Sequence, residues 1–206
     1  MKEKFRNHLA YNWWLYIVVA VLVLVLWLSL FSRLAQPNNN EQINITYIGT
    51  SFDHLKLQSD LYDELPERTE QNIKKISVEN AVIDGEYDLN TLLRARLAGN
   101  CDFVIIEGSI IEEYEIDLAS YFAQLDIASF ERIFGDIEAV TTDDKIFGLL
   151  CNSGTKMDNY YSGKNTCKIF FNKNSVNLSN LFGGKVEQDA AVQVIKYLTE
   201  RKDVKA

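Results

Sequence analysis

One uninterrupted apolar run separates the first part of the chain from the rest. Residues 13–31 read WWLYIVVAVLVLVLWLSLF and contain no charged residue and no proline. About 20 apolar residues are enough to cross the core of a bilayer as a helix, because a helix satisfies its own backbone hydrogen bonds there. Trp13, Trp14 and Tyr16 suit the headgroup region at one end of such a helix. The pattern therefore predicts a transmembrane anchor over residues 13–32, in contact with the lipid bilayer.

The charges that flank this run predict its orientation. Lys2, Lys4 and Arg6 precede it, and only Arg33 follows it closely. Cytoplasmic flanks carry the excess of basic residues, so we expect a cytoplasmic N-terminus and an extracellular C-terminal part. The run exceeds the roughly 7–15 apolar residues of a signal peptide, and residues 32–35 (SRLA) form a poor cleavage sequence. The expected product is an uncleaved, single-pass protein of the plasma membrane.

After the anchor, the pattern changes to alternating strands and helices. The stretch INITYIG alternates apolar and polar positions as a half-buried strand does. Leu57, Leu61 and Leu65 lie four apart, as on one face of a helix that Pro66 ends. We expect strands at 43–49, 73–79, 102–107 and 168–172, helices at 54–65, 89–99 and 188–201, and a hairpin at 137–150. The alternation predicts an α/β fold: a single three-layer lobe with a mixed, mostly parallel sheet, preceded by one transmembrane helix.

Charge narrows the class of partner. The expected organisation is a cytoplasmic N-terminus (1–12), the anchor (13–32), a polar tether (33–42) and an extracellular domain (43–206). Four of the 21 basic and one of the 29 acidic residues precede residue 37, which leaves 17 basic and 28 acidic residues, a net charge of about −11. Such a surface is repelled by phosphate backbones. Nucleic acid is therefore not expected as a partner.

The reactive residues give little support to catalysis. Cys101, Cys151 and Cys167 are an odd number, so at least one thiol stays unpaired. Core cysteines and a Cys151–Cys167 disulfide are both open, since exported domains tolerate disulfides. His54 is the one histidine after the anchor, and the chain has no glycine-rich phosphate loop and no G-x-S-x-G motif. We expect no enzyme, no metal and no cofactor.

Five stretches occur in a characteristic order: LLRARLAGNCDFVIIEGS (92–109), DLASYF (117–122), DDKIFGLL (143–150), KIFFNKNS (168–175) and AAVQVIKYLTE (190–200). In this order they resemble the extracellular solute-binding proteins of bacterial transporters, which have the type 2 periplasmic-binding fold. The resemblance implies a link to transport and a permease as a partner.

Two departures from that family bear on the expected architecture. Leu150 stands where the family has a proline in its hairpin motif. The family also inserts a whole second lobe between the hairpin and the final strand, where residues 152–167 supply only sixteen positions. We therefore expect a solute-binding-like domain reduced to one lobe.

Polar residues at the strand ends are the candidate ligand site. In open α/β sheets, ligands bind beyond the carboxyl ends of strands. The residues expected there are Thr50 and Ser51, Gly108 and Ser109, and Asn152 and Ser153. Hydroxyls and glycine backbone N–H groups suit a polar solute, although the same residue types are ordinary in turns.

Tyr160 and Tyr161 are the candidate partner-binding residues. They lie in the polar stretch 152–167, and tyrosine is common at protein interfaces. The alternative is that they pack this loop onto the domain. Two functions follow: a solute-binding-like module associated with a transport system, or a non-catalytic interaction ectodomain of a membrane complex that has lost solute binding.

Overall fold

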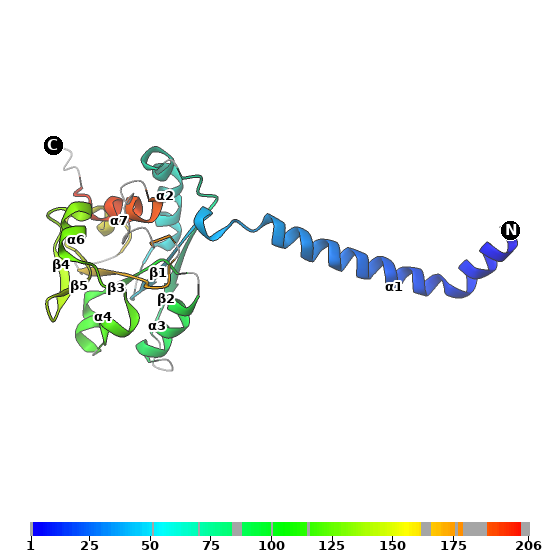
Figure 1. The fold of residues 1–206 in the computed structure, drawn as a ribbon, viewed down its shortest axis with the longest axis horizontal. Helices are drawn as coiled ribbons and strands as arrows, with labels where there is room; N and C mark the ends of the chain where they lie inside the picture. Colours follow the sequence, from blue (N-terminus) through cyan, green and yellow to red (C-terminus); the bar gives the residue numbers. More distant parts are fainter. Residues whose placement is uncertain are drawn as a thin grey trace. The chain divides into compact units, whose positions relative to one another are not determined.

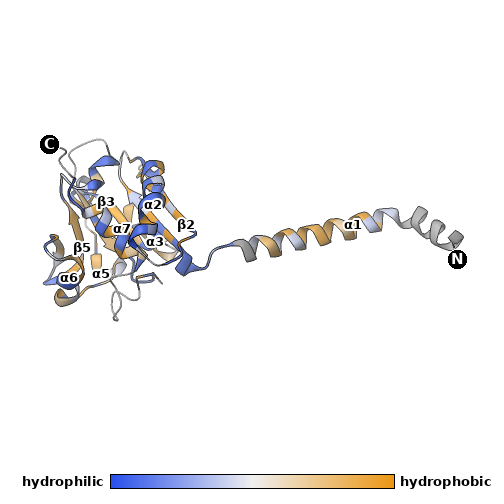
Figure 2. Ribbon diagram, turned by 90° about the horizontal axis from the view of Figure 1, so that it is seen from above, coloured by the Kyte–Doolittle hydropathy of each residue, from blue (hydrophilic) through white to orange (hydrophobic). Residues whose placement is uncertain are grey.

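The computed structural model describes residues 2–50, 52–69, 71–83, 88–99, 101–114, 116–161, 166–175, 177–178 and 189–202, with backbone alone for 2–12 and 33–35. The chain divides into two compact units, Met1–Pro37 and Asn38–Ala206. The first unit is the helix α1 (Lys2–Ala35). Its stretch Trp13–Ser32 is long and apolar enough to cross a membrane, and the middle of α1 is predominantly hydrophobic (Figure 2).

The second unit is built on a mixed six-stranded sheet of order β2-β1-β3-β6-β5-β4. Its strands are β1 (Gln42–Ile48), β2 (Lys75–Ala81), β3 (Phe103–Glu107), β4 (Ala139–Thr142), β5 (Lys145–Cys151) and β6 (Cys167–Phe171). The α/β fold with a mixed sheet is confirmed, and the hairpin β4–β5 forms one edge as expected. Parallel pairing joins β2, β1 and β3, whereas β3, β6, β5 and β4 pair antiparallel. The expectation of a mostly parallel sheet therefore holds for one half only.

Helices cover both faces of this sheet (Figure 1). One hydrophobic core lies under α2 (His54–Arg68), α6 (Ile127–Phe134) and α7 (Ala190–Thr199). The other lies under α3 (Leu89–Ala98), α4 (Gly108–Glu113) and α5 (Leu118–Tyr121). All five residues of β3 are buried, as its continuous apolar pattern predicts for a strand covered on both sides. The described residues also form two 3-10 turns, η1 (Asn39–Glu41) and η2 (Lys156–Asn159).

Local signals set several helix and turn boundaries. Asp53 caps α2 by accepting a hydrogen bond from the backbone of Lys56 at 3.0 Å. The β4–β5 turn places Asp143 and Asp144 at φ of 50° and 59°, a left-handed geometry that suits a tight hairpin. The expectation that Pro66 ends α2 is wrong, because the helix runs on to Arg68. Contacts made by Arg68 with Glu200 and with the Tyr197 ring hold this last turn in the helix.

The cysteines are buried thiols. Cys101, Cys151 and Cys167 are all free, although Cys151 and Cys167 face each other across β5 and β6. Burial raises the pKa of Cys101 to about 11 and that of Cys167 to about 12. Of the two alternatives left open by the sequence, the structure has the core cysteines.

Candidate functional site

The carboxyl ends of β1, β3 and β5 lie together at one end of the strands. We call this end of the sheet the strand-tip edge. This follows from the pairing, because β3 is parallel to β1, and β6 lies antiparallel between β3 and β5. The sequence-predicted residues at this edge are Thr50 after β1, Gly108 and Ser109 at the start of α4, and Asn152 and Ser153 after β5. Ser51 lies outside the described residues.

Thr50 is already engaged with Glu107, the last residue of β3. The Glu107 carboxylate is buried, and its Oε2 accepts hydrogen bonds from Thr50 N at 3.0 Å and Thr50 Oγ1 at 3.2 Å. The Tyr47 hydroxyl lies 3.5 Å from the same oxygen, and its ring stacks on Phe52 with centroids 4.0 Å apart. Burial raises the pKa of the Tyr47 hydroxyl. The Glu107 carboxylate therefore occupies the two Thr50 donors that would otherwise be available to a solute.

The remaining strand-tip residues differ in what they offer. The Gly108 N–H donates to Thr166 O at 2.8 Å. A Cβ on Gly108 would lie 2.7 Å from Thr166 Oγ1, so this position requires glycine for close packing. Ser109 and Ser153 are exposed, and Asn152 donates from Nδ2 to Glu138 Oε2 at 3.3 Å.

The two tyrosines of the loop have different surroundings. Tyr160 is only 1% exposed, and its hydroxyl bonds Asp60 at 2.8 Å and Tyr197 at 2.9 Å. Tyr161 is partly buried and donates to Asp158 at 2.9 Å. The buried ring of Tyr160 packs the loop onto α2 and α7, which is the alternative considered above, and its surface is covered in this structure.

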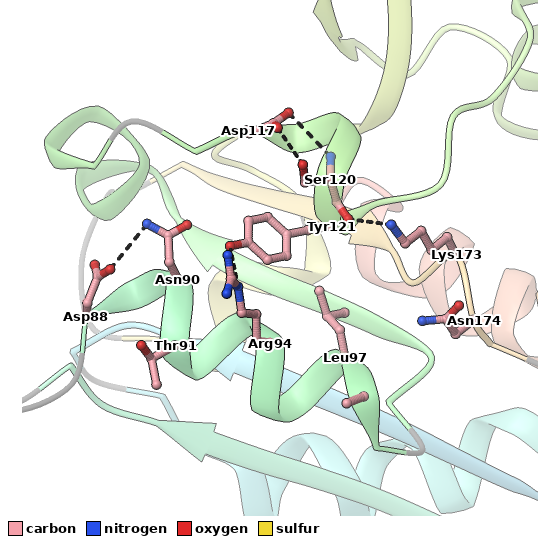
Figure 3. A pocket seen from close by; sticks show the side chains of 11 residues that line it. Asp88, Asn90, Thr91, Arg94, Leu97, Asp117, Ser120, Tyr121, Lys173 and Asn174 are labelled. Carbon is pink, nitrogen blue, oxygen red and sulfur yellow. Dashed lines mark hydrogen bonds between the residues drawn. The ribbon is translucent and has the colours of Figure 1, made fainter.

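The largest hollow described lies elsewhere, between α3 and α5 (Figure 3). This cavity, which we call the α3–α5 groove, has a volume of about 900 Å³ and reaches the turn after β6. That volume is within the range of small-molecule sites. Most of its lining residues are of polar type, among them Asp88, Asn90, Thr91, Arg94, Tyr121 and Lys173. Smaller hollows of about 30 and 170 Å³ surround the C-terminal end of α3.

A buried polar network holds the turn that forms one end of the groove. Asn172 donates from Nδ2 to Cys101 O at 2.6 Å and accepts from Asn174 N at 3.0 Å. Asp102 accepts a hydrogen bond from Ser175 Oγ. Burial raises the pKa of Asp102, although its hydrogen bonds oppose this. Asp102 and Asn172 thus hold the turn that forms this end of the groove.

Sequence reasoning missed the groove because it arises between distant segments. Asn90, Thr91 and Arg94 occupy the polar face of an amphipathic helix, which alone indicates only a solvated surface. Their spacing places them together on α3, but nothing local indicates that Tyr121 and Lys173 face them. Within the described ranges, no group of three or more histidine, cysteine and acidic side chains is placed to hold a metal ion.

Comparison with known proteins adds one partial similarity. No family model matches the chain, and no curated protein matches it. A similar solved structure is the N-glycan transport solute binding protein (NgtS) from Streptococcus pneumoniae in complex with Man1GlcNAc, with 14% identity and a TM-score of 0.37. The match covers 55% of this chain and 25% of that chain. At this level the similarity concerns part of the chain and assigns no function.

Proposed function

We propose that this protein is a membrane-anchored, extracellular solute-binding-like module associated with a transport system. The observation that carries the proposal is the α3–α5 groove, a polar hollow of about 900 Å³ on a compact α/β domain. A mostly polar lining with a few apolar side chains suits a hydrophilic solute better than a lipid or an apolar peptide. The proposal includes no catalytic role.

The anchor supports the link to a membrane complex. The stretch Trp13–Ser32 meets the length and composition of a span, and the basic residues ahead of it favour a cytoplasmic N-terminus. A module tethered in this way stays close to a permease, which raises its effective concentration there. A weak solute site is then sufficient for delivery.

Purification of the anchored protein in mild detergent tests this function. We expect a permease or a transport ATPase to co-purify with the full chain. The matched control is a fusion of residues 1–42 to an unrelated globular domain, which carries the same anchor and tether. Equal recovery of the permease with both proteins, or recovery with neither, would contradict a role for the α/β domain.

A second function is favoured by the contacts at the strand-tip edge. Glu107 occupies the Thr50 donors and Thr166 occupies the Gly108 N–H, so these donors at the edge are satisfied from within the domain. A non-catalytic interaction ectodomain that has lost solute binding would look the same there. The two functions differ in the groove, where the first requires a bound solute and the second does not.

A further inference from the structure

Arg94 is the cation at the centre of the α3–α5 groove. Its Nε donates to the Tyr121 hydroxyl at 3.3 Å, which bridges α3 and α5 (Figure 3). Tyr121 is only 8% exposed, so packing holds the oxygen that orients the guanidinium. Among the described residues, no hydrogen bond or ion pair occupies the two terminal nitrogens of Arg94. A guanidinium fixed at Nε and open at both ends suits bidentate binding of a planar or tetrahedral oxyanion.

A second cation lies at the end of the groove formed by the turn after β6. Lys173 Nζ donates to the carbonyl oxygen of Ser120, which leaves further N–H groups of the ammonium for another acceptor. Asn174 lines the same end. Arg94 and Lys173 are therefore both held by neutral acceptors from α5, and each keeps its charge and part of its donor capacity.

The carboxylates of the groove are committed to local contacts. Asp88 accepts from Asn90 Nδ2 at 3.3 Å. Asp117 caps α5 by accepting from Ser120 N at 3.3 Å and from the Ser120 hydroxyl, and the hydroxyl bond lowers its pKa. Two cations and two carboxylates thus line the groove, each carboxylate already accepts a hydrogen bond from its own segment, and the charge of Lys173 also lowers the pKa of Asp117. This is notable in a domain with a net charge of about −11, whose surface otherwise repels anions.

We propose that the α3–α5 groove binds a small polar solute that carries an oxyanion, with Arg94 as the residue that contacts it. The inference deepens the solute-binding function proposed above and rests on it. The carboxylate or phosphate of the solute lies against the terminal nitrogens of Arg94, and Lys173 adds attraction from one end. Leu97 and Tyr121 contact its carbon skeleton, and Asn90 and Thr91 bond its hydroxyls. Sugar acids and sugar phosphates share this chemistry.

Titration of the full chain in a non-ionic detergent tests the site. The probes are glucose 6-phosphate and inorganic phosphate, followed by ³¹P line width, with gluconate as a competitor and glucose as the neutral comparison. We expect Arg94→Gln to weaken phosphate-ester binding by about tenfold, the loss of a charge-assisted bidentate contact. Raising the salt from about 50 to about 300 mM should weaken binding to the parent protein as well.

Arg96→Gln is the matched control. Arg96 lies two residues further along α3 and pairs with Glu79 outside the groove, so its loss changes the net charge equally and should alter affinity by less than about twofold. Unchanged circular dichroism and melting temperature of each variant verify folding. Displacement of the phosphate ester by gluconate would place both oxyanions at one site.

Three results would overturn the inference. They are equal losses in the Arg94 and Arg96 variants, glucose binding as tight as that of glucose 6-phosphate, and an absence of oxyanion binding by the folded parent protein. None of these three results bears on whether a permease co-purifies with the full chain, because that experiment does not depend on Arg94. A failure of the site is therefore distinguishable from a failure of the transport link.

Discussion

At the scale of single residues, the Glu107 carboxylate lies in the interior of the strand-tip edge, 3% exposed. A buried charge costs free energy unless donors surround it. Thr50 supplies two of these donors, and the Tyr47 hydroxyl lies at the limit of hydrogen-bond distance. Thr50, one of the residues that the sequence indicates for a ligand, thus binds an internal carboxylate in this structure.

Glu107→Ala should lower the free energy of unfolding by about 1–3 kcal/mol, because it leaves the buried Tyr47 hydroxyl and the two Thr50 donors without their acceptor. The control is Glu113→Ala, at an exposed position in α4, which should change stability by less than about 0.5 kcal/mol. Urea denaturation of the full chain in detergent measures both. Similar stability of the two variants would mean that Glu107 does not hold the strand tips.

Asp189 gives the stability of the domain a pH dependence. It is 3% exposed, its Oδ2 has no hydrogen-bond partner among the described residues, and burial raises its pKa to about 6. The folded state therefore binds the proton more tightly than the unfolded state, whose pKa is about 3.9. The stabilising contribution of the protonated Asp189 side chain to the free energy of unfolding is fully present below about pH 4. It is lost as the pH rises through about 6.

We expect Asp189 to lower the free energy of unfolding by up to about 3 kcal/mol between pH 4 and pH 7, from a shift of about two pKa units. Asp189→Asn should flatten this part of the pH profile, since the amide does not titrate. Denaturation at several pH values, with parent and variant side by side, measures the difference. An unchanged slope in the variant would assign the pH dependence to other groups.

At the scale of elements, the amphipathic helices follow their sequence patterns closely. Leu57, Leu61 and Leu65 are buried on α2, as their spacing indicates. Contacts from outside the helix decide its end, because Arg68 pairs with Glu200 and lies over the Tyr197 ring, 5.2 Å from its centroid. These contacts favour a helical turn beyond Pro66 that local propensity alone does not indicate.

The two faces of α2 allow a matched pair of substitutions. Leu61→Ala should lower the free energy of unfolding by about 2–5 kcal/mol, the loss of a fully buried side chain plus the cavity that remains. Leu55→Ala removes the same atoms from a side chain that is 68% exposed, and it should change stability by less than about 0.5 kcal/mol. Equal effects of the two variants on the denaturation midpoint would contradict the packing of α2.

At the scale of the whole molecule, two units of different chemistry share one chain. The span candidate Trp13–Ser32 is apolar on all sides, with side chains such as Leu26 67% exposed in this unit. The domain after it buries its apolar residues in two cores. A helix of this length and composition is a candidate membrane span.

This division leads to a topological prediction. Protease added to intact cells should remove the α/β domain, because the basic residues before the anchor are retained in the cytoplasm. Immunoblotting against the domain measures the loss, and a cytoplasmic protein that stays intact shows that the cells are sealed. Protection of the domain until lysis would reverse the orientation.

A single lobe also limits affinity. The α3–α5 groove is open on one side and lined largely by exposed residues, so a bound solute keeps one side in water. Immobilising the solute is then poorly compensated, and we expect dissociation constants no tighter than about the millimolar range, about −4 kcal/mol. Calorimetry on the full chain in detergent, with sugars, sugar acids and amino acids, measures this. A micromolar dissociation constant would contradict the expectation that a groove open on one side binds its solute weakly.

The sequence by itself determined the strands of the sheet and the helices α1, α2, α3 and α7. The apolar run of α1, the alternation of strands and helices, the buried stripe of α2 and the hairpin turn at Asp143 and Asp144 all follow from local periodicity and backbone preference. These properties depend on neighbours within a few residues, so they are present in the sequence before any long-range contact forms.

Only the tertiary structure decided which elements meet. It placed β6 antiparallel between β3 and β5, brought Glu107 to Thr50 across 57 residues of chain, and set Tyr121 of α5 against Arg94 of α3. Each of these contacts depends on burial and hydrogen bonding between segments far apart in the chain. Residue types at a strand end are equally compatible with a ligand site and with an internal contact, and at Thr50 the structure has the internal contact.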